Sequence, residues 1–232
     1  MTSINKRARV AGFFYLLLSI AAPLRLVYIP GTLFVNGNPA ATAGNIVAHE
    51  TLFRLGIVSD MVSGVLLIFV TLALYRLFME VDQKQAVLMV ILGGVLPAAL
   101  DFFMVVNDSA ALILVRGADF LSVFDKPQRD ALAMLFLRLH HQEMLGAMIF
   151  WGLWLFPLGI LTCRSRFLPR FLGVWLIING FAYLAVSLAG LLLPHYESAV
   201  SRITFPALSG ELAFLLWLLI KGAKEQAADA PA

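Results

Sequence analysis

Six long runs of apolar residues, separated by short polar segments, dominate the chain. They cover about residues 9–29, 56–79, 85–106, 144–163, 170–193 and 204–222. A helix needs about 20 mostly apolar residues to cross the hydrocarbon core of a bilayer. Because the runs are continuously apolar and do not alternate with polar residues, they indicate helices. The pattern therefore predicts an all-α membrane protein, a six-transmembrane-helix bundle that forms a single integral membrane domain over residues 1–232.

Two longer segments, residues 30–55 and 107–143, are predicted to lie on the outer side and to contain short interfacial helices. The turn residues 36–39 are expected to precede one such helix. Residues 125–127 (Asp-Lys-Pro) predict a helix start, because an N-cap carboxylate and an early proline both favour one. The fourth helix therefore begins well before the membrane, or a separate interfacial helix precedes it. Residues 225–232 form a polar tail.

The basic residues predict the orientation of the bundle. The clusters Lys6–Arg9 and Arg164–Arg170 contain no acidic residue and fall on the same side as the N-terminus. Since cytoplasmic flanks carry an excess of Lys and Arg, both termini are expected in the cytoplasm, with the chain in the cell (inner) membrane. The basic residues Lys6, Arg7 and Arg9, followed by the apolar run Val10–Leu24, resemble the first part of a signal peptide. Residues 21–23 (Ala-Ala-Pro) make a poor cleavage site, so the run is interpreted as an uncleaved first span.

The composition of the chain indicates that a lipid bilayer surrounds it and is its expected partner. Hydrophobic residues make up 61% and charged residues 13% of the chain, against roughly 45–50% and 25% in soluble domains. The single cysteine excludes an intramolecular disulfide. The basic residues stand in short clusters without a long basic stripe, which argues against a nucleic-acid partner. None of these features specifies an oligomeric state.

Three charged residues inside the predicted spans reach one level of the bundle. By the rise of a helix, Arg25, Asp60 and Asp101 each lie about 24–25 Å from the cytoplasmic edge. Ionisable residues within spans usually face protein or water, so each is a candidate functional residue. One interpretation is an outward-facing polar cavity that these three residues line. The other is a buried ion pair that fixes helix packing, or an arginine that extends to the outer interface.

Glu211 is predicted near the midplane, about 15 Å from the cytoplasmic edge, and Asn179 reaches a similar depth. A carboxyl at that depth is expected to be neutral unless a partner or water stabilises its charge. It could therefore carry a proton or a cation. Alternatively, it is a neutral carboxylic acid that forms hydrogen bonds with Asn179, Ser209 or a backbone carbonyl.

Histidines and carboxylates near the expected outer ends of helices form a candidate metal site. Imidazole and carboxylate suit zinc and related divalent ions, and His140 and Glu143 share one helix face because they are three residues apart. The sequence contains no His-Glu-x-x-His motif. Ordinary interfacial histidines are the alternative interpretation, in which no cofactor is bound. The full candidate set is His49, Glu50, His140, His141 and Glu143.

Several stretches, in order, resemble one known family. They are Arg9-Val-Ala-Gly12 in the first span, Phe53-Arg54-Leu-Gly56 followed by Asp60 at the second, Leu168–Gly173 before the fifth, and Gly210-Glu211 in the last. Together they resemble the bacterial multi-pass membrane family known as domain of unknown function 4386. The resemblance covers essentially the whole chain. It implies a multi-pass membrane protein and implies that Arg54, Asp60 and Glu211 belong to the family's pattern.

These observations favour a non-enzymatic membrane protein. The leading hypothesis is a small transporter, or a ligand-binding sensor or accessory protein, that takes a small or lipid-like ligand from the outer side. Its candidate ligand- or ion-binding residues are Arg25, Arg54, Asp60, Asp101, Asn179 and Glu211. The alternative is a metal-dependent membrane enzyme that acts near the outer interface. A scaffold that uses Gly93-Gly94, Gly152 and Gly159 for close helix contacts with a partner is a third hypothesis.

Overall fold

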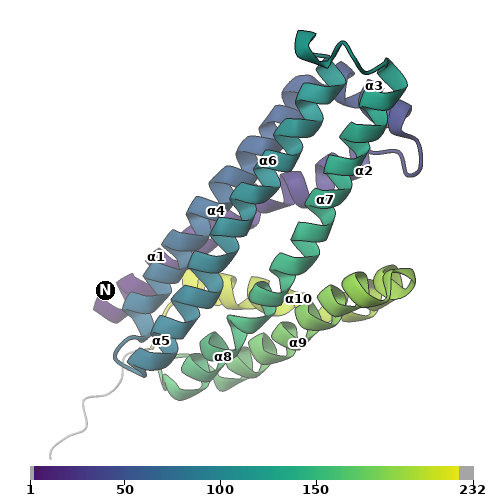
Figure 1. The fold of residues 1–232 in the computed structure, drawn as a ribbon. Helices are drawn as coiled ribbons and strands as arrows, with labels where there is room; N and C mark the ends of the chain where they lie inside the picture. Colours follow the sequence, from purple (N-terminus) through teal and green to yellow (C-terminus); the bar gives the residue numbers. More distant parts are fainter. Residues whose placement is uncertain (1–2, 225–232) are drawn as a thin grey trace, which may run out of the picture. The chain divides into compact units, whose positions relative to one another are not determined.

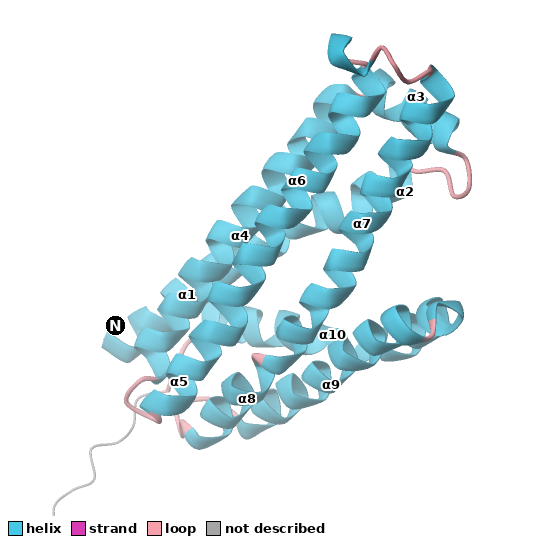
Figure 2. Cartoon of the chain, in the orientation of Figure 1, coloured by secondary structure: helices cyan, strands magenta, loops and turns pink. Residues whose placement is uncertain are grey.

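The computed structural model describes residues 3–224, which fold into helices joined by short loops, without a strand in that range (Figures 1 and 2). The first half contains α1 (Ser3–Pro23), a π-helical turn (Leu24–Tyr28), α2 (Ile29–Leu33), α3 (Pro39–Ala48), α4 (Glu50–Phe78), α5 (Gln83–Val90), a second π-helical turn (Ile91–Val95) and α6 (Leu96–Arg116). The second half contains a 3-10 turn (Asp119–Leu121), α7 (Lys126–Leu153), α8 (Leu155–Arg164), α9 (Arg170–Leu192), a 3-10 turn (Pro194–Tyr196), α10 (Glu197–Leu216) and a last π-helical turn (Trp217–Lys221). The predicted polar tail, residues 225–232, lies outside the described residues.

Six helical stretches are long and apolar enough to cross a membrane. Within the described residues they are Ser3–Leu33, Glu50–Phe78, Gln83–Arg116, Lys126–Arg164, Arg170–Leu192 and Pro194–Lys221. Each corresponds to one of the apolar runs of the sequence, so the prediction of an all-α, six-span membrane protein is confirmed. The third stretch continues beyond the predicted end of its span at residue 106.

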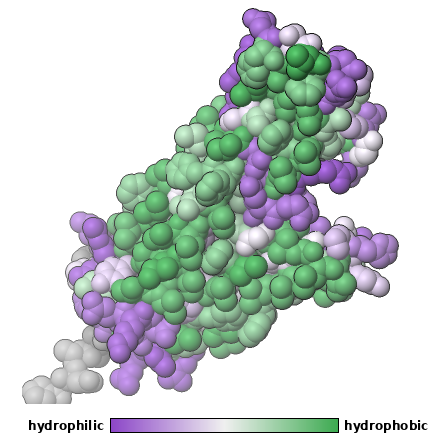
Figure 3. Space-filling model, viewed as in Figure 1, coloured by the Kyte–Doolittle hydropathy of each residue, from purple (hydrophilic) through white to green (hydrophobic). Residues whose placement is uncertain are grey.

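Large hydrophobic side chains stand on the outside of these helices, as lipid contact requires. On α4 they include Val58, Met61, Val62, Val65 and Phe69, each at least 42% exposed. In the view of Figure 3, hydrophobic side chains cover most of the helix surfaces, and hydrophilic ones gather near the loops and along part of α7. So much exposed apolar area is unfavourable in water, whereas the bilayer core solvates it. The surface therefore indicates association with a lipid bilayer.

Polar side chains define where several helices begin. The Asn38 carboxamide oxygen accepts a hydrogen bond from the backbone N–H of Ala41 (3.0 Å) and starts α3, which confirms a short helix within residues 30–55. The Asp125 carboxylate accepts from the N–H of Gln128 (2.8 Å), and the Gln128 side-chain oxygen accepts from the N–H of Asp125 (3.0 Å). This reciprocal cap starts α7. Because α7 is continuous from Lys126 to Leu153, residues 126–143 form one helix with the first part of the fourth predicted span.

The chain forms two compact units. Unit 1 comprises residues 1–17, 66–97 and 145–232, and unit 2 comprises residues 18–65 and 98–144. Within unit 1, α8 packs closely on α9, because a Cβ on Gly159 would lie 2.7 Å from the carbonyl oxygen of Gly173. Gly93 likewise faces the Trp154 ring. The small residues noted in the sequence thus serve packing inside this unit. In unit 2, buried apolar side chains such as Ile29, Phe53 and Leu112 form the core.

Candidate functional site

A network of buried ionisable side chains lies in unit 2. It consists of Arg25, Asp60, Asp101, Asp108 and His140, each no more than 6% exposed. They come from the π-helical turn after α1, from α4, from α6 and from α7. Buried charges are costly and persist only where partners or a ligand compensate them, so this network is the primary candidate site.

Local sequence features direct Arg25 into the interior. Pro23 lacks a backbone N–H, and the π-helical turn Leu24–Tyr28 follows it directly. Gly56 of α4 leaves room for the arginine stem, because a Cβ there would lie 3.3 Å from the Arg25 Cδ atom. The Phe34 ring centre lies 5.5 Å from the guanidinium carbon, within the range of a cation–π contact. Arg25 is consequently only 2% exposed.

The Arg25 guanidinium forms a two-pronged ion pair with Asp108. Its Nε donates to Asp108 Oδ2 (2.5 Å) and its Nη2 donates to Oδ1 (2.7 Å). Such charge-assisted, bidentate pairs are stronger and more specific in geometry than neutral hydrogen bonds. Asp108 is fully buried, so the pair is shielded from solvent. One interpretation of Arg25 was a buried ion pair that fixes helix packing. Asp108 is the partner that such a pair requires.

His140 connects this ion pair to Asp60. Its Nδ1 lies 3.3 Å from both the Met104 carbonyl oxygen and Asp108 Oδ1. Both of these atoms accept hydrogen bonds, so Nδ1 carries a ring proton. Nε2 in turn lies 3.8 Å from Asp60 Oδ2, and neither of these two buried atoms has a hydrogen-bond partner in the part of the chain that the structure describes.

Asp101 completes the network beside Asp60. The two carboxyl groups interact electrostatically. Gly64 of α4 permits this approach, because a Cβ there would lie 3.4 Å from Asp101 Oδ2. Asp101 and Asp108 are seven residues apart in α6 and therefore share one helix face. In Figure 1, α4 and α6 lie side by side along this region.

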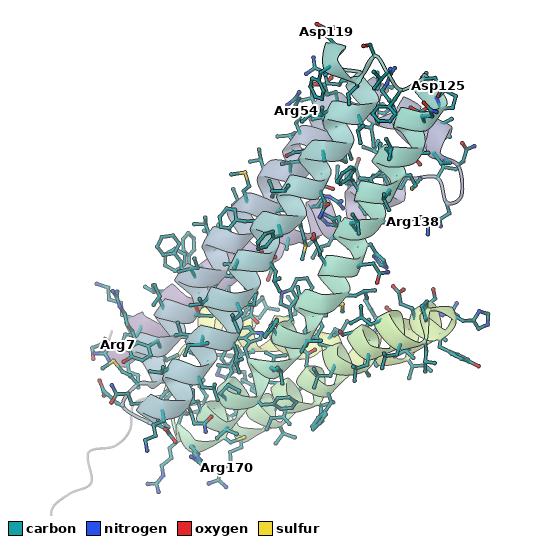
Figure 4. The ribbon with its side chains drawn as sticks, viewed as in Figure 1. Arg7, Arg54, Asp119, Asp125, Arg138 and Arg170 are labelled. Atoms are coloured by element: carbon teal, nitrogen blue, oxygen red, sulfur yellow. The ribbon has the colours of Figure 1, made fainter. Side chains whose placement is uncertain are left out.

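A cavity of about 450 Å³ in unit 2 includes part of the network in its wall. Arg25 and His140 contribute to the lining, together with Arg138 and His141 of α7. Arg138 extends from α7 in Figure 4. The remaining lining residues are Leu26, Pro30, Phe34, Val35, Asn36, Gly37, Met134, Leu137 and Met144. The walls are thus mainly apolar with several basic groups, and no acidic side chain among residues 3–224 contributes to the lining.

Glu211 belongs to a separate cluster in unit 1. The Tyr15 hydroxyl donates a hydrogen bond to its Oε1, the Tyr183 hydroxyl also hydrogen-bonds to it, and the Asn179 Nδ2 donates to its Oε2 (3.3 Å). The predicted contact between Glu211 and Asn179 is therefore present. Ser209, the other predicted partner, donates instead to the Pro206 carbonyl oxygen (2.5 Å). The sequence pattern did not indicate the two tyrosines as partners of the carboxyl.

The other candidate residues of the sequence lie apart from the network. Arg54 pairs with Glu50 (2.7 Å) on the exposed side of α4, and Arg116 approaches the same carboxylate (3.6 Å). Glu143 Oε2 accepts a hydrogen bond from the Asn107 amide (2.7 Å). His49 is exposed just before α4, and His141 lines the cavity.

Among the described residues, one group of side chains has a spacing that could hold a metal, and it differs from the predicted set. It is Asp60, Asp108 and His140, whose ligand atoms lie within 4.8 Å of one another. Only His140 belonged to the predicted metal set, and Asp60 belonged to the predicted ligand set. Asp108 was missed because it lies beyond the predicted end of the third span. Its seven-residue spacing from Asp101 was the one sequence signal that could have indicated it.

Within residues 3–224, six apolar helices with charged side chains buried between them define a multi-pass helical membrane protein. The family model described as Domain of unknown function (DUF4386) matches residues 10–222, so the chain belongs to that family. An uncharacterized protein of Archaeoglobus fulgidus is 37% identical over 76 residues, which cover 33% of this chain. The chain spans 44% of that relative's length. No solved structure matches the chain.

Proposed function

We propose that this protein is a small transporter or ligand-binding sensor that takes an amphipathic anion into the cavity of unit 2. The observation that carries the proposal is the lining of that cavity of about 450 Å³, which is apolar on most sides and includes the guanidinium of Arg138. Small-molecule sites typically measure roughly 300–1,000 Å³ and combine apolar walls with a few polar groups. The size and the lining of the cavity are both of this kind.

The charge of the lining selects the head group of the ligand. Arg25 is already neutralised by Asp108, so the exposed Arg138 supplies the positive charge that a ligand would meet. An arginine fork matches a carboxylate, and an anion that binds there encounters no lining carboxylate to repel it. Phe34, Met134 and Leu137 provide apolar contacts for a short hydrocarbon chain. A medium-chain fatty acid is the simplest molecule with these properties.

The experiment compares three ten-carbon probes, decanoate, decanol and decyltrimethylammonium, with protein in zwitterionic lipid nanodiscs. Decanoate is expected to bind at least about 10-fold more tightly than the other two, because a hydrogen-bonded charge pair contributes about 1.5–3 kcal/mol. Arg138→Gln should reduce decanoate affinity to the level of decanol. Arg202→Gln, which removes an exposed arginine outside the cavity, is the matched control. Equal binding of all three probes would contradict the proposed function.

Proteoliposomes then separate transport from sensing. Uptake of labelled decanoate that Arg138→Gln abolishes would identify a transporter, and binding without uptake would identify a sensor or accessory protein. Glu211→Gln and Asp60→Asn extend this assay to the carboxyl predicted as a possible carrier and to one of the carboxyls predicted to line the polar cavity. Unchanged flux in both variants would remove these carboxyls from the mechanism.

The proposed orientation places both termini in the cytoplasm and the chain in the inner membrane. It is supported by the acid-free basic clusters Lys6–Arg9 and Arg164–Arg170. In a Cys163→Ser background, a cysteine that replaces Asp119 should react with an impermeant maleimide on intact cells. A cysteine that replaces Lys84 should react only in inverted vesicles. The opposite labelling pattern would reverse the orientation.

A further inference from the structure

We propose that Asp60 and His140 bind a divalent metal ion of the zinc class inside unit 2, with Asp108 positioning the histidine. The inference concerns the buried wall of the cavity and does not depend on the anionic ligand proposed above. It rests on two observations, which are the facing ligand atoms of Asp60 and His140 and the charge of the network around them.

The two ligand atoms present lone pairs to the same space. His140 Nε2 and Asp60 Oδ2 lie 3.8 Å apart, both are buried, and neither has a hydrogen-bond partner. In the neutral form of His140, with its proton on Nδ1 facing the Met104 carbonyl and Asp108, the facing Nε2 and the Asp60 carboxylate oxygen are both acceptors. Two acceptors repel each other unless a positive ion or a proton lies between them. Unpartnered buried polar atoms cost free energy, so this arrangement calls for such an occupant.

The charge of the network matches a divalent ion. With His140 neutral and the carboxyl groups of Asp60, Asp101 and Asp108 all ionised, the one guanidinium of Arg25 leaves an excess of two negative charges. Each of the five side chains is at least nine-tenths buried, so solvent does little to offset this excess. One divalent cation neutralises it, whereas a monovalent cation leaves one buried negative charge uncompensated.

The ligand types and their separation select the metal. Neutral imidazole with carboxylate suits zinc and its neighbours, whereas calcium and magnesium prefer oxygen ligands alone. Two ligands about 2.1 Å from one tetrahedral zinc ion lie about 3.4 Å apart. The observed 3.8 Å is a few tenths of an ångström wider, a difference that a side-chain rotation closes. Water or a ligand from the cavity would complete the coordination, since His140 also lines the cavity.

Asp108 acts through His140. Metal-binding histidines usually donate their second ring N–H to a carboxylate or a backbone carbonyl, which fixes the ring and raises its basicity. The His140 Nδ1 has both kinds of acceptor at 3.3 Å. The two oxygens of Asp108 are engaged by Arg25, so Arg25 in turn holds the positioning carboxylate in place.

The test uses full-length protein purified without chelator in lipid nanodiscs, stripped of metal and then titrated with Zn²⁺ or Co²⁺ in the absence of any fatty acid. About one equivalent should bind, and bound Co²⁺ should show the visible absorption of a low-symmetry nitrogen–oxygen site. Asp60→Asn and His140→Gln should each weaken binding at least about 100-fold. Asp119→Asn and His195→Gln, which alter exposed residues outside the network, should bind as the unaltered protein does.

Asp108→Asn separates positioning from ligation. It should weaken the metal by about 10- to 100-fold and shift the Co²⁺ spectrum, while a residue with a purely structural role would change stability and leave the spectrum alone. If Asp60→Asn fails to fold, His140→Gln and the Co²⁺ spectrum carry the test. Less than a tenth of an equivalent of metal in the unaltered protein, or equal affinity in Asp60→Asn, would overturn the metal site. Decanoate binding that persists after metal removal would leave the proposed function standing by itself.

Discussion

Removal of one partner of the Arg25–Asp108 pair should be among the most damaging single changes in unit 2. Arg25→Met leaves the Asp108 carboxylate buried with only His140 beside it, and Asp108→Leu leaves the guanidinium buried against Phe34. Loss of one member of a buried pair typically costs about 3–5 kcal/mol, because the remaining charge is uncompensated. Arg25 is 2% exposed and Asp108 is fully buried, so each single variant is expected to lose about 3–5 kcal/mol of stability.

The double variant Arg25→Met/Asp108→Leu tests the reason for this loss. Replacement of both charges by apolar side chains of similar size removes the desolvation penalty together with the attraction. Such replacements are often neutral or stabilising by about 1–4 kcal/mol. The double variant should therefore be more stable than either single variant, with a large coupling energy between the two sites.

The assay is reversible unfolding in mixed micelles, followed by the fluorescence of the four tryptophans. Arg54→Met is the matched control, because Arg54 pairs with Glu50 while half exposed and should cost less than about 1 kcal/mol. The reasoning fails if the Arg25 and Arg54 variants lose the same free energy. It also fails if the double variant is destabilised by the sum of the two single losses.

Two further predictions concern unit 1. Gly159→Ala should cost about 1–3 kcal/mol, because its Cβ would lie 2.6 Å from Ile177 Cγ1 and 2.7 Å from the Gly173 carbonyl oxygen. Gly146→Ala, which meets no atom within 4 Å, should be neutral or stabilising by up to about 1 kcal/mol, and thermal unfolding of the two variants distinguishes them. Tyr15→Phe should cost about 1.5–3 kcal/mol, since it removes a hydrogen bond to the Glu211 carboxyl, and equal stability of Tyr15→Phe and the unaltered protein would refute that contact.

The sequence by itself determined the class and the helices of this protein. Runs of about 20 apolar residues leave few alternatives, because the backbone must satisfy its hydrogen bonds internally in lipid. For the same local reason the start of α7 followed from residues 125–127, since a cap depends on neighbours three residues away. The six spans, the short helix after Pro39 and the early start of the fourth span were therefore predictable.

Only the tertiary structure decided which polar residues meet. The third helix continues to Arg116 because the polar residues after position 106 find partners, with Asn107 bonded to Glu143 and Asp108 to Arg25. The sequence predicts that Arg25, Asp60 and Asp101 lie at one depth. It does not predict how each helix is rotated about its axis, and therefore which neighbours these side chains face. That rotation depends on contacts such as Gly56 against Arg25, which join residues distant in sequence. The same contacts separated His140 from the other predicted metal ligands and turned it toward Asp60 and Asp108.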